Sequence, residues 1–256
     1  MLYNYINITI KVKNMSDAKR GFMPQDEKDF NAEGIAKMKV AAQDVLYLLD
    51  AGYSTKSATT FVGDHYQLSE RQRICLARSI SPTQDVISRL NREVTDIRDE
   101  TLYIDGFNAI ICLEVAYASR MSFKCMDGSI RDLAGLMGTY RIMGVTHQAI
   151  RAILNTLTIR GVKEAVIYLD KPVSNSGRLK TLIFEIANEM NCPIKLEVIL
   201  LNAVDAQLKK LPLIASGDSI ILNECDKWFN LNKATIDDNF VKYPYLNVCP
   251  VNWRLT

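Results

Sequence analysis

The chain has 256 residues, which is long enough for one large domain or two modest ones. Hydrophobic residues make up 48% and charged residues 23%, proportions that exclude a disordered or fibrous protein. A net charge of only +2 excludes a molecule that is basic throughout. No apolar run approaches the roughly 18 residues that a membrane span needs. We therefore expect a cytoplasmic protein with no membrane partner.

The first 14 residues, MLYNYINITIKVKN, contain alternating apolar side chains. They lack the basic start, continuous apolar core and small-residue cleavage site of a signal peptide. An extra strand, a frayed leader and translated sequence upstream of a start at Met15 all fit this pattern. We assign residues 1–25 to a leader that is partly flexible.

Cysteine and histidine are too scattered for a zinc site. No C-x-x-C pair occurs among the six cysteines, and neither histidine lies near two of them. Reduced, buried thiols are therefore expected. Any bound metal would be held mainly by carboxylate oxygen, which suits Mg²⁺ or Mn²⁺.

Residues 26–98 read as a small helical domain. Apolar residues recur at helical spacing over 35–49, and Gly52 follows as a stop signal. A second short helix is predicted over 55–62. Ser69 with Gln72 forms a capping-box pattern that opens a third helix.

The same capping pattern occurs a second time. Ser81 with Gln84, and Pro82 at the first helical position, predict the start of a fourth helix. A helix-turn-helix is then possible, with 70–80 as the reading helix. Its basic side chains would be Arg71, Arg73 and Arg78. Any small helical bundle mimics this geometry. The 14 basic and 14 acidic residues of 1–100 argue against DNA reading.

From residue 99 to 256 the hydrophobic pattern changes to that of an α/β domain. Short apolar runs predict strands at 102–105, 165–170, 194–201 and 213–218. Helices are predicted over 129–160, 176–190, 204–210 and 225–231, with a last strand near 246–251. Continuous apolar strands that alternate with helices indicate a three-layer fold with a parallel sheet. The boundary with the helical domain falls near 96–101.

An aspartate lies at or just past the end of each main predicted strand. These are Asp105, Asp170, Asp205 and Asp218. Ligands of open parallel sheets bind outside the carboxyl ends of the strands, so we expect the four to meet in one crevice. Their repulsion, roughly 4 kcal/mol for a pair at 4 Å, would favour a bound cation.

Metal held by aspartates suits attack of water on a phosphodiester, without a catalytic histidine or serine. The chain has no G-x-S-x-G, P-loop or G-x-G-x-x-G motif that would indicate another chemistry. We assign Asp105, Asp170, Asp205 and Asp218 to catalysis. Asp127 or Asp132 could be a supplementary acid.

Polar side chains near these aspartates are candidates for substrate binding. The loop after Asp170 runs into a predicted helix start, which makes a plausible phosphate cradle or a simple capped loop. Residues 115–180 include ten basic residues and only four acidic ones. They would form a phosphate-tracking face or ordinary solvated helices. The candidate substrate-binding residues are Asn108, Ser174, Ser176, Arg178, Lys180 and Ser216.

Three segments resemble the PIN and NYN nuclease domains. LYIDGFNAI resembles their first strand, NAVDAQLKKL their second acidic motif, and ASGDSIIL their Ser/Thr-x-Asp motif. The resemblance implies metal-binding roles for Asp105, Asp205 and Asp218. The further acid that many such nucleases place after the first strand has no clear match, and only Asp205 matches the second motif.

The whole chain also resembles an uncharacterised prokaryotic family that joins a small helical module to a PIN-like domain. RGFMPQDEKDF, DVLYLLDAGYSTKSATTFVGDHYQLSERQR and LDKPVSNSG carry this similarity over most of 20–230. It implies a bacterial or archaeal source, and the PIN-like part implies a homodimer. We expect a metal-dependent ribonuclease with RNA as partner. The alternative is a non-catalytic nucleic-acid-binding regulator with a degenerate PIN-like domain. A dehalogenase-type phosphohydrolase is rejected, because Phe107 stands where that family needs a second aspartate.

Overall fold

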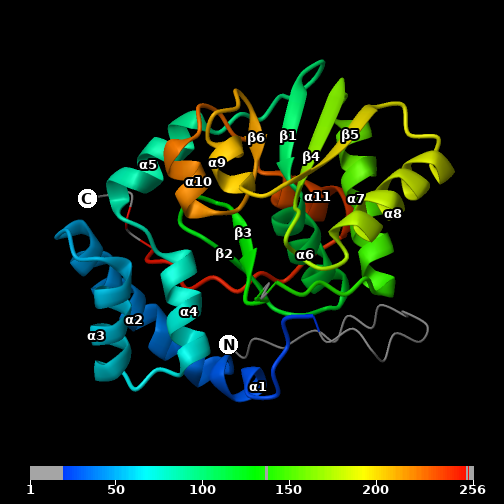
Figure 1. Cartoon of the computed structure of the whole chain (residues 1–256). Helices are drawn as coiled ribbons and strands as arrows, with labels where there is room; N and C mark the ends of the chain where they lie inside the picture. The colour runs from blue at the N-terminus through cyan, green and yellow to red at the C-terminus, as the bar shows by residue number, and fades with distance from the viewer. Residues whose placement is uncertain (1–19, 136–137, 252, 254–256) are drawn as a thin grey trace.

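The computed structural model describes residues 20–135, 138–251 and 253 (Figure 1). Most of the predicted leader, with the possible start at Met15, lies outside the described residues. Among the residues that are described, no helix is long and apolar enough to cross a membrane.

A helical module precedes an α/β domain, as predicted. The strands are β1 (Thr101–Asp105), β2 (Ser122–Lys124), β3 (Ile130–Asp132), β4 (Glu164–Asp170), β5 (Lys195–Leu201) and β6 (Ile214–Ala215). The module's helices are α1 (Asp26–Asp29), α2 (Ala32–Asp50), α3 (Thr55–His65), α4 (Glu70–Ser79) and α5 (Thr83–Arg92). The helices of the α/β domain are α6 (Gly106–Tyr117), α7 (Gly144–Ile159), α8 (Ser176–Glu189), α9 (Val204–Leu208), α10 (Ser219–Glu224) and α11 (Leu231–Asn239).

Two predicted helix ends in the module are confirmed. The Ser69 hydroxyl accepts from the backbone N–H of Gln72, and the Gln72 side chain accepts from the N–H of Ser69, which completes the capping box of α4. Gly52 follows α2 in the left-handed region, with φ of 89°, where glycine carries no steric cost.

The second capping box, of Ser81 with Gln84, is wrong. Pro82 occupies the N-cap position of α5 and supplies no side-chain cap. Asp50, from the end of α2, accepts instead from the N–H of Thr83 at 2.7 Å and from its hydroxyl at 2.8 Å. Because the Asp50 carboxylate caps α5, the Ser81 side chain is not needed as a cap, and it is buried.

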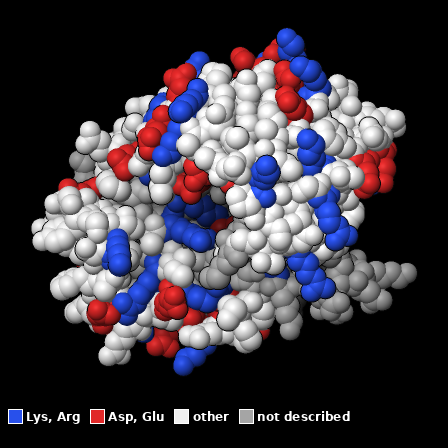
Figure 2. Space-filling view, in the orientation of Figure 1, with Lys and Arg blue, Asp and Glu red and all other residues white. Residues whose placement is uncertain are grey.

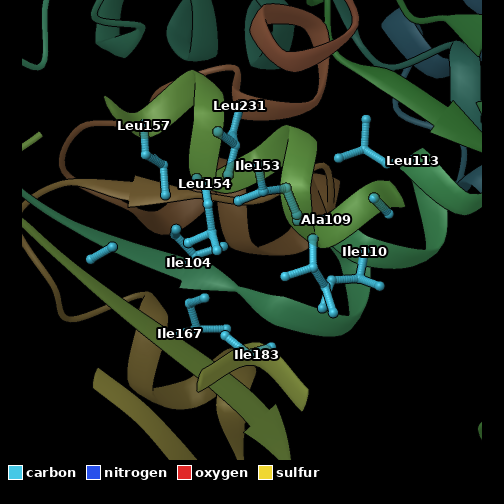
Figure 3. Packing of buried hydrophobic residues seen from close by; sticks show 14 of the residues in the cluster. Ile104, Ala109, Ile110, Leu113, Ile153, Leu154, Leu157, Ile167, Ile183 and Leu231 are labelled. Carbon is cyan, nitrogen blue, oxygen red and sulfur yellow. The ribbon is translucent and has the colours of Figure 1, made fainter. Parts of the chain in front are cut away.

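The main sheet is parallel throughout, with the strand order β5-β4-β1-β6. Successive side chains along each strand point to opposite faces of the sheet. Ile104 and Ile167 pack with residues of α6, α7, α8 and α11 on one face (Figure 3). Tyr168 and Val166 pack with α9 and α10 on the other. Helices therefore cover both faces, as the continuous apolar strands predict.

Two helix predictions in this half are wrong in part. Residues 130–132 form β3, which pairs antiparallel with β2, and the predicted helix over 129–160 begins only at Gly144. Residues 225–230 are not helical, because Trp228 makes isolated bridges to Glu93 and Ile214 at the edge of the sheet. The strand predicted near 246–251 is reduced to one bridge between Leu246 and Phe123.

The β2–β3 hairpin joins the two halves of the molecule. Phe123, Met126 and Leu133, from the hairpin and the residues beside it, belong to the same buried apolar cluster as Leu76 and Val45 of the module. The helical module therefore shares its core with the hairpin. Figure 1 shows α4 beside this hairpin.

Candidate functional site

A cleft opens at the carboxyl ends of the parallel strands. The chain passes from β1 to β4 on one side and returns to β6 on the other, so a topological switch point lies at β1. The cleft there has a volume of about 450 Å³, in the range of small-molecule sites. Its polar lining comprises Asp105, Asp132, Asp170, Asp205, Asp218, Ser219, Asn108, Asn232, Arg78 and Arg131. All four strand-end aspartates of the sequence prediction therefore face one cleft.

Asp105 ends β1 and is also the N-cap of α6. One carboxylate oxygen accepts from the backbone N–H of Asn108 at 3.3 Å, and the other accepts from the Ser216 hydroxyl at 2.8 Å. The residue is only 7% exposed. Burial, helped by the charges of Asp205 and Asp218, raises the pKa of Asp105 to about 7 although the two hydrogen bonds lower it.

Gly106 lets α6 begin directly against the sheet. A Cβ at this position would lie 2.7 Å from side-chain atoms of Ile167 and Leu169 and from the carbonyl oxygen of Tyr168. The φ of Gly106 is not in the left-handed region. Close packing on β4 is what requires glycine here, and it holds Asp105 at the rim of the sheet.

Asp218 lies beyond the strand that it was predicted to close. β6 ends at Ala215, and Asp218 is the N-cap of α10, where its carboxylate accepts from the N–H of Ile220 at 2.7 Å. The Ser216 hydroxyl accepts from the N–H of Asp218 at 3.1 Å while it donates to Asp105. Ser216 thus links the Asp105 carboxylate to the backbone of Asp218.

Asn108 ties the same loop to α6. Its side-chain oxygen accepts from the backbone N–H of Gly217 at 2.7 Å. A Cβ on Gly217 would lie 3.1 Å from that oxygen, so glycine leaves room for the contact. The structure therefore gives Asn108 a positioning role at the cleft wall.

Asp170 and Asp205 are the more open members of the set. Asp170 ends β4 and is half-buried, and Asp205 is exposed in the first turn of α9. Burial raises the pKa of both carboxyl groups. The charge of Asp205 adds to the shift of Asp170, and that of Asp218 adds to the shift of Asp205.

Of the two supplementary acids, Asp132 lines the cleft and Asp127 does not. Burial raises the pKa of Asp132 to about 6. Asp127 is buried between two arginines, with carboxylate-to-guanidinium distances of 2.8 Å to Arg89 and 3.2 Å to Arg131. Asp127 is therefore a structural ion-pair residue, and Asp132 is a fifth cleft aspartate.

The donor chemistry of the cleft fits a hard divalent cation. Five carboxylates face it, and mutual repulsion helps to raise the pKa values of three of them, Asp105, Asp170 and Asp205. Within 20–135, 138–251 and 253, however, no three His, Cys, Asp or Glu side chains lie close enough to hold an ion together. A shared ion would require side-chain rotation, for which the exposed Asp205 has the most freedom.

The predicted phosphate cradle is not part of the cleft lining. The Ser174 hydroxyl accepts from the N–H of Tyr140 at 3.2 Å, and Ser176 is buried at the start of α8. Arg178 is exposed and Lys180 is half-buried on the same helix. The loop is used to hold the segment around Tyr140, so these four side chains are separate from the aspartates.

Two arginines and Asn232 were not predicted to lie in the cleft. Arg78 comes from α4 of the helical module, Arg131 from β3 and Asn232 from α11. No motif in the sequence marks them, because their position depends on how the hairpin packs. The sequence indicates Arg78 only as a candidate in a possible DNA-reading helix.

The geometry of α4 does not favour DNA reading. Arg71 forms an ion pair with Asp26, and the Arg73 guanidinium lies 2.7 Å from the Asp64 carboxylate. Arg71 also donates to the carbonyl oxygen of Gly21. These side chains are engaged within the module, which leaves Arg78 as the arginine of this helix that reaches the cleft.

Comparison with known proteins places this two-part architecture in a family. The family described as "Domain of unknown function (DUF5616)" matches residues 94–234, and "Protein of unknown function (DUF434)" matches residues 37–92. Uncharacterized protein MJ0935 of Methanocaldococcus jannaschii is 34% identical over 184 residues, which cover 71% of this chain and 87% of that protein. No solved structure matches the chain. The two matched ranges meet at the junction of the helical module and the α/β domain, and the chain belongs to the DUF5616 family.

Proposed function

We propose that the protein is a metal-dependent phosphodiesterase that cleaves RNA, with its site in the aspartate cleft. The observation that carries the proposal is the presence of five aspartates around one cleft at the switch point of a parallel sheet. Three of them, Asp105, Asp205 and Asp218, lie in the segments that resemble PIN and NYN motifs. RNA is the substrate class that this resemblance implies.

We also propose that the α/β domain is PIN-like. The parallel order β5-β4-β1-β6, the helices on both faces and the aspartates at the strand ends support this assignment. Asp132 of β3 supports it further, since it supplies an additional acid that follows the first strand and its helix.

Mg²⁺ or Mn²⁺ held by Asp105, Asp205 and Asp218 would activate water and neutralise charge on the leaving oxygen. Asp105 and Asp218 are suited to fixed ligation, because Ser216 and backbone N–H groups orient their carboxylates. Asp170 is half-buried with a raised pKa, so it is suited to accept a proton from the attacking water.

The test is cleavage of labelled single-stranded and structured RNA by the purified protein. We expect activity with Mn²⁺ or Mg²⁺, loss of activity in EDTA, and a loss of about a thousandfold in Asp218→Asn. Asp226→Asn is a matched control, because Asp226 is exposed and lies outside the cleft lining. Activity that survives in the double variant Asp105→Asn, Asp218→Asn would show that the site is assigned incorrectly.

A further inference from the structure

Part of the cleft lining carries positive charge that comes from both halves of the molecule. Among the described residues, the basic side chains of the cleft lining are Arg78 and Arg131. Figure 2 shows Lys or Arg side chains inside a hollow near the middle of one face, with acidic atoms beside them. Basic and acidic groups in one cleft provide two kinds of contact for a phosphate: direct ones to arginine and cation-mediated ones to carboxylate.

Hydrogen bonds hold the two arginines next to each other. The Arg131 guanidinium donates to the backbone carbonyl of Arg78, and the Arg78 guanidinium donates to the backbone carbonyl of Asp132 at 2.5 Å. These bonds link α4 to β3, so the hairpin fixes Arg78 relative to the sheet. The charge of Arg78 also acts on Asp132, and that of Asp218 acts on Arg131. These two side chains, here called the arginine wall, therefore line the same cleft as the aspartates and lie within range of the charges of Asp132 and Asp218.

Some hydrogen-bonding capacity at this wall is not used within the described part of the chain. The Arg131 side chain is 9% exposed, and its Nε has no hydrogen-bond partner there. The side-chain oxygen of Asn232, which also lines the cleft, is likewise buried without a partner. Folded proteins pair nearly all such atoms, so an unpaired guanidinium N–H beside a cleft indicates a ligand that supplies an acceptor.

We propose that Arg78 and Arg131 bind a phosphate group of a single-stranded nucleic acid, so that the helical module forms one wall of the substrate site. This inference rests on the proposed function for the identity of the substrate. A guanidinium offers a planar fork of donors that matches phosphate oxygens. Arg78 is a half-buried side chain without a carboxylate ion pair in the described chain, so its charge is available to a ligand. Arg131, paired with Asp127, contributes mainly its remaining donors.

The experiment measures binding of a fluorescently labelled 12-nucleotide single-stranded RNA in Mg²⁺ at several salt concentrations. Arg78→Gln should weaken binding about tenfold and lower the slope of log affinity against log salt by about 0.7, the loss of one phosphate contact. Arg78→Lys keeps the charge, so it should retain the slope but still bind more weakly. Arg98→Gln removes an exposed arginine outside the cleft lining and should change neither.

If the role of Arg78 were only structural, both Arg78 variants would have a lower thermal midpoint than the wild type. Substitution leaves its backbone carbonyl, which accepts from Arg131 and Cys125, in place. A lysine at this position can also donate to the carbonyl of Asp132, so we expect the thermal midpoint of Arg78→Lys to match that of the wild type. If Arg78→Gln fails to fold, Arg78→Lys with its retained slope and reduced affinity remains the deciding variant.

The outcomes separate this inference from the proposed function. Binding that depends on Arg78 without hydrolysis by any variant would support the arginine wall and contradict the nuclease. Hydrolysis with unchanged affinity and salt slope in both Arg78 variants would support the nuclease and overturn the arginine wall. In an active enzyme, Arg78→Gln should raise KM more than it lowers kcat.

Discussion

Two buried aspartates of this protein, Asp127 and Asp105, have pKa values that are shifted in opposite directions. Burial alone would raise the pKa of Asp127, but Arg131, a hydrogen bond from Ser129 and Arg89 outweigh it and lower the pKa below its usual range. Asp105 is also buried, and its pKa rises to about 7. Asp105 has no arginine to neutralise it among its hydrogen-bonded neighbours.

The opposite pKa shifts distinguish a carboxylate that stabilises the fold from one that is open to a ligand. Asp127 links α5 to the hairpin through two arginines, so its charge is already used in the folded chain. Asp105 shares a cleft with other carboxylates, an arrangement that is costly without a cation. Aspartate is thus a structural ion-pair residue at position 127 and a candidate metal ligand at position 105.

The largest effect is expected from Asp127→Asn. The change leaves Arg89, which is 2% exposed, and Arg131 without their buried counter-charge. Loss of one partner in such a pair typically lowers the free energy of unfolding by about 3–5 kcal/mol. Urea unfolding of the purified variant measures it. Asp85→Asn, at an exposed aspartate 4.0 Å from the same Arg89, should cost no more than about 0.5 kcal/mol. If the two variants lost equal free energies of unfolding, the buried ion pair of Asp127 would be no more important than the exposed pair of Asp85.

The next effect is stabilisation by Mg²⁺. A cation that binds only the folded protein raises the free energy of unfolding by about 2.7 kcal/mol at a hundred times its Kd. We expect thermal unfolding of the wild type and of Asp226→Asn to shift upward with Mg²⁺ or Mn²⁺. The double variant Asp105→Asn, Asp218→Asn should show no shift. A full shift in the double variant would mean that the cation binds elsewhere.

A smaller stabilisation, opposite in sign to the effect of Asp127→Asn, is expected from Asp105→Asn in EDTA. Above pH 7 the wild-type carboxylate is charged and buried, and the amide removes that charge. The free energy of unfolding at pH 8 should rise by about 1 kcal/mol. Chemical denaturation of both proteins in EDTA tests this increase. A loss as large as that of Asp127→Asn would instead make Asp105 a structural residue.

The smallest effect is the acid dependence that Asp127 contributes. Its folded pKa lies below the unfolded value, so the unfolded chain binds more protons near pH 4. Its stabilisation is therefore complete above the unfolded pKa and is lost as pH falls through the folded pKa. The fall in the unfolding midpoint between pH 5 and 3 should be shallower in Asp127→Asn than in the wild type. Parallel curves would show that Asp127 does not titrate differently in the two states.

The positions of the four strand-end aspartates could be predicted because parallel strands that are buried on both faces leave continuous apolar runs in the sequence. Asp105 and Asp170 end such runs, and the runs themselves identify the edge of the sheet. The capping box at Ser69 was equally readable, because it depends on residues three apart.

Interactions between distant segments could not be predicted in the same way. β2 and β3 have three residues each, too few for a periodic signal, so Asp132 and Arg131 were placed in a helix. Arg78 could be named only as a candidate for a possible DNA-reading helix, since helical spacing does not reveal which element packs on a helix. Trp228 is fully buried, and its bridges to Glu93 and Ile214 stand where a helix was predicted.

The most direct test is a crystal structure of the protein soaked in Mn²⁺, with anomalous scattering used to locate the ion. We expect a manganese peak in the cleft, within bonding distance of carboxylate oxygens of Asp105 and Asp218, and with the Asp205 side chain turned towards it. A cleft without an anomalous peak at saturating Mn²⁺, or a peak bound only by other residues, would contradict the shared cation site.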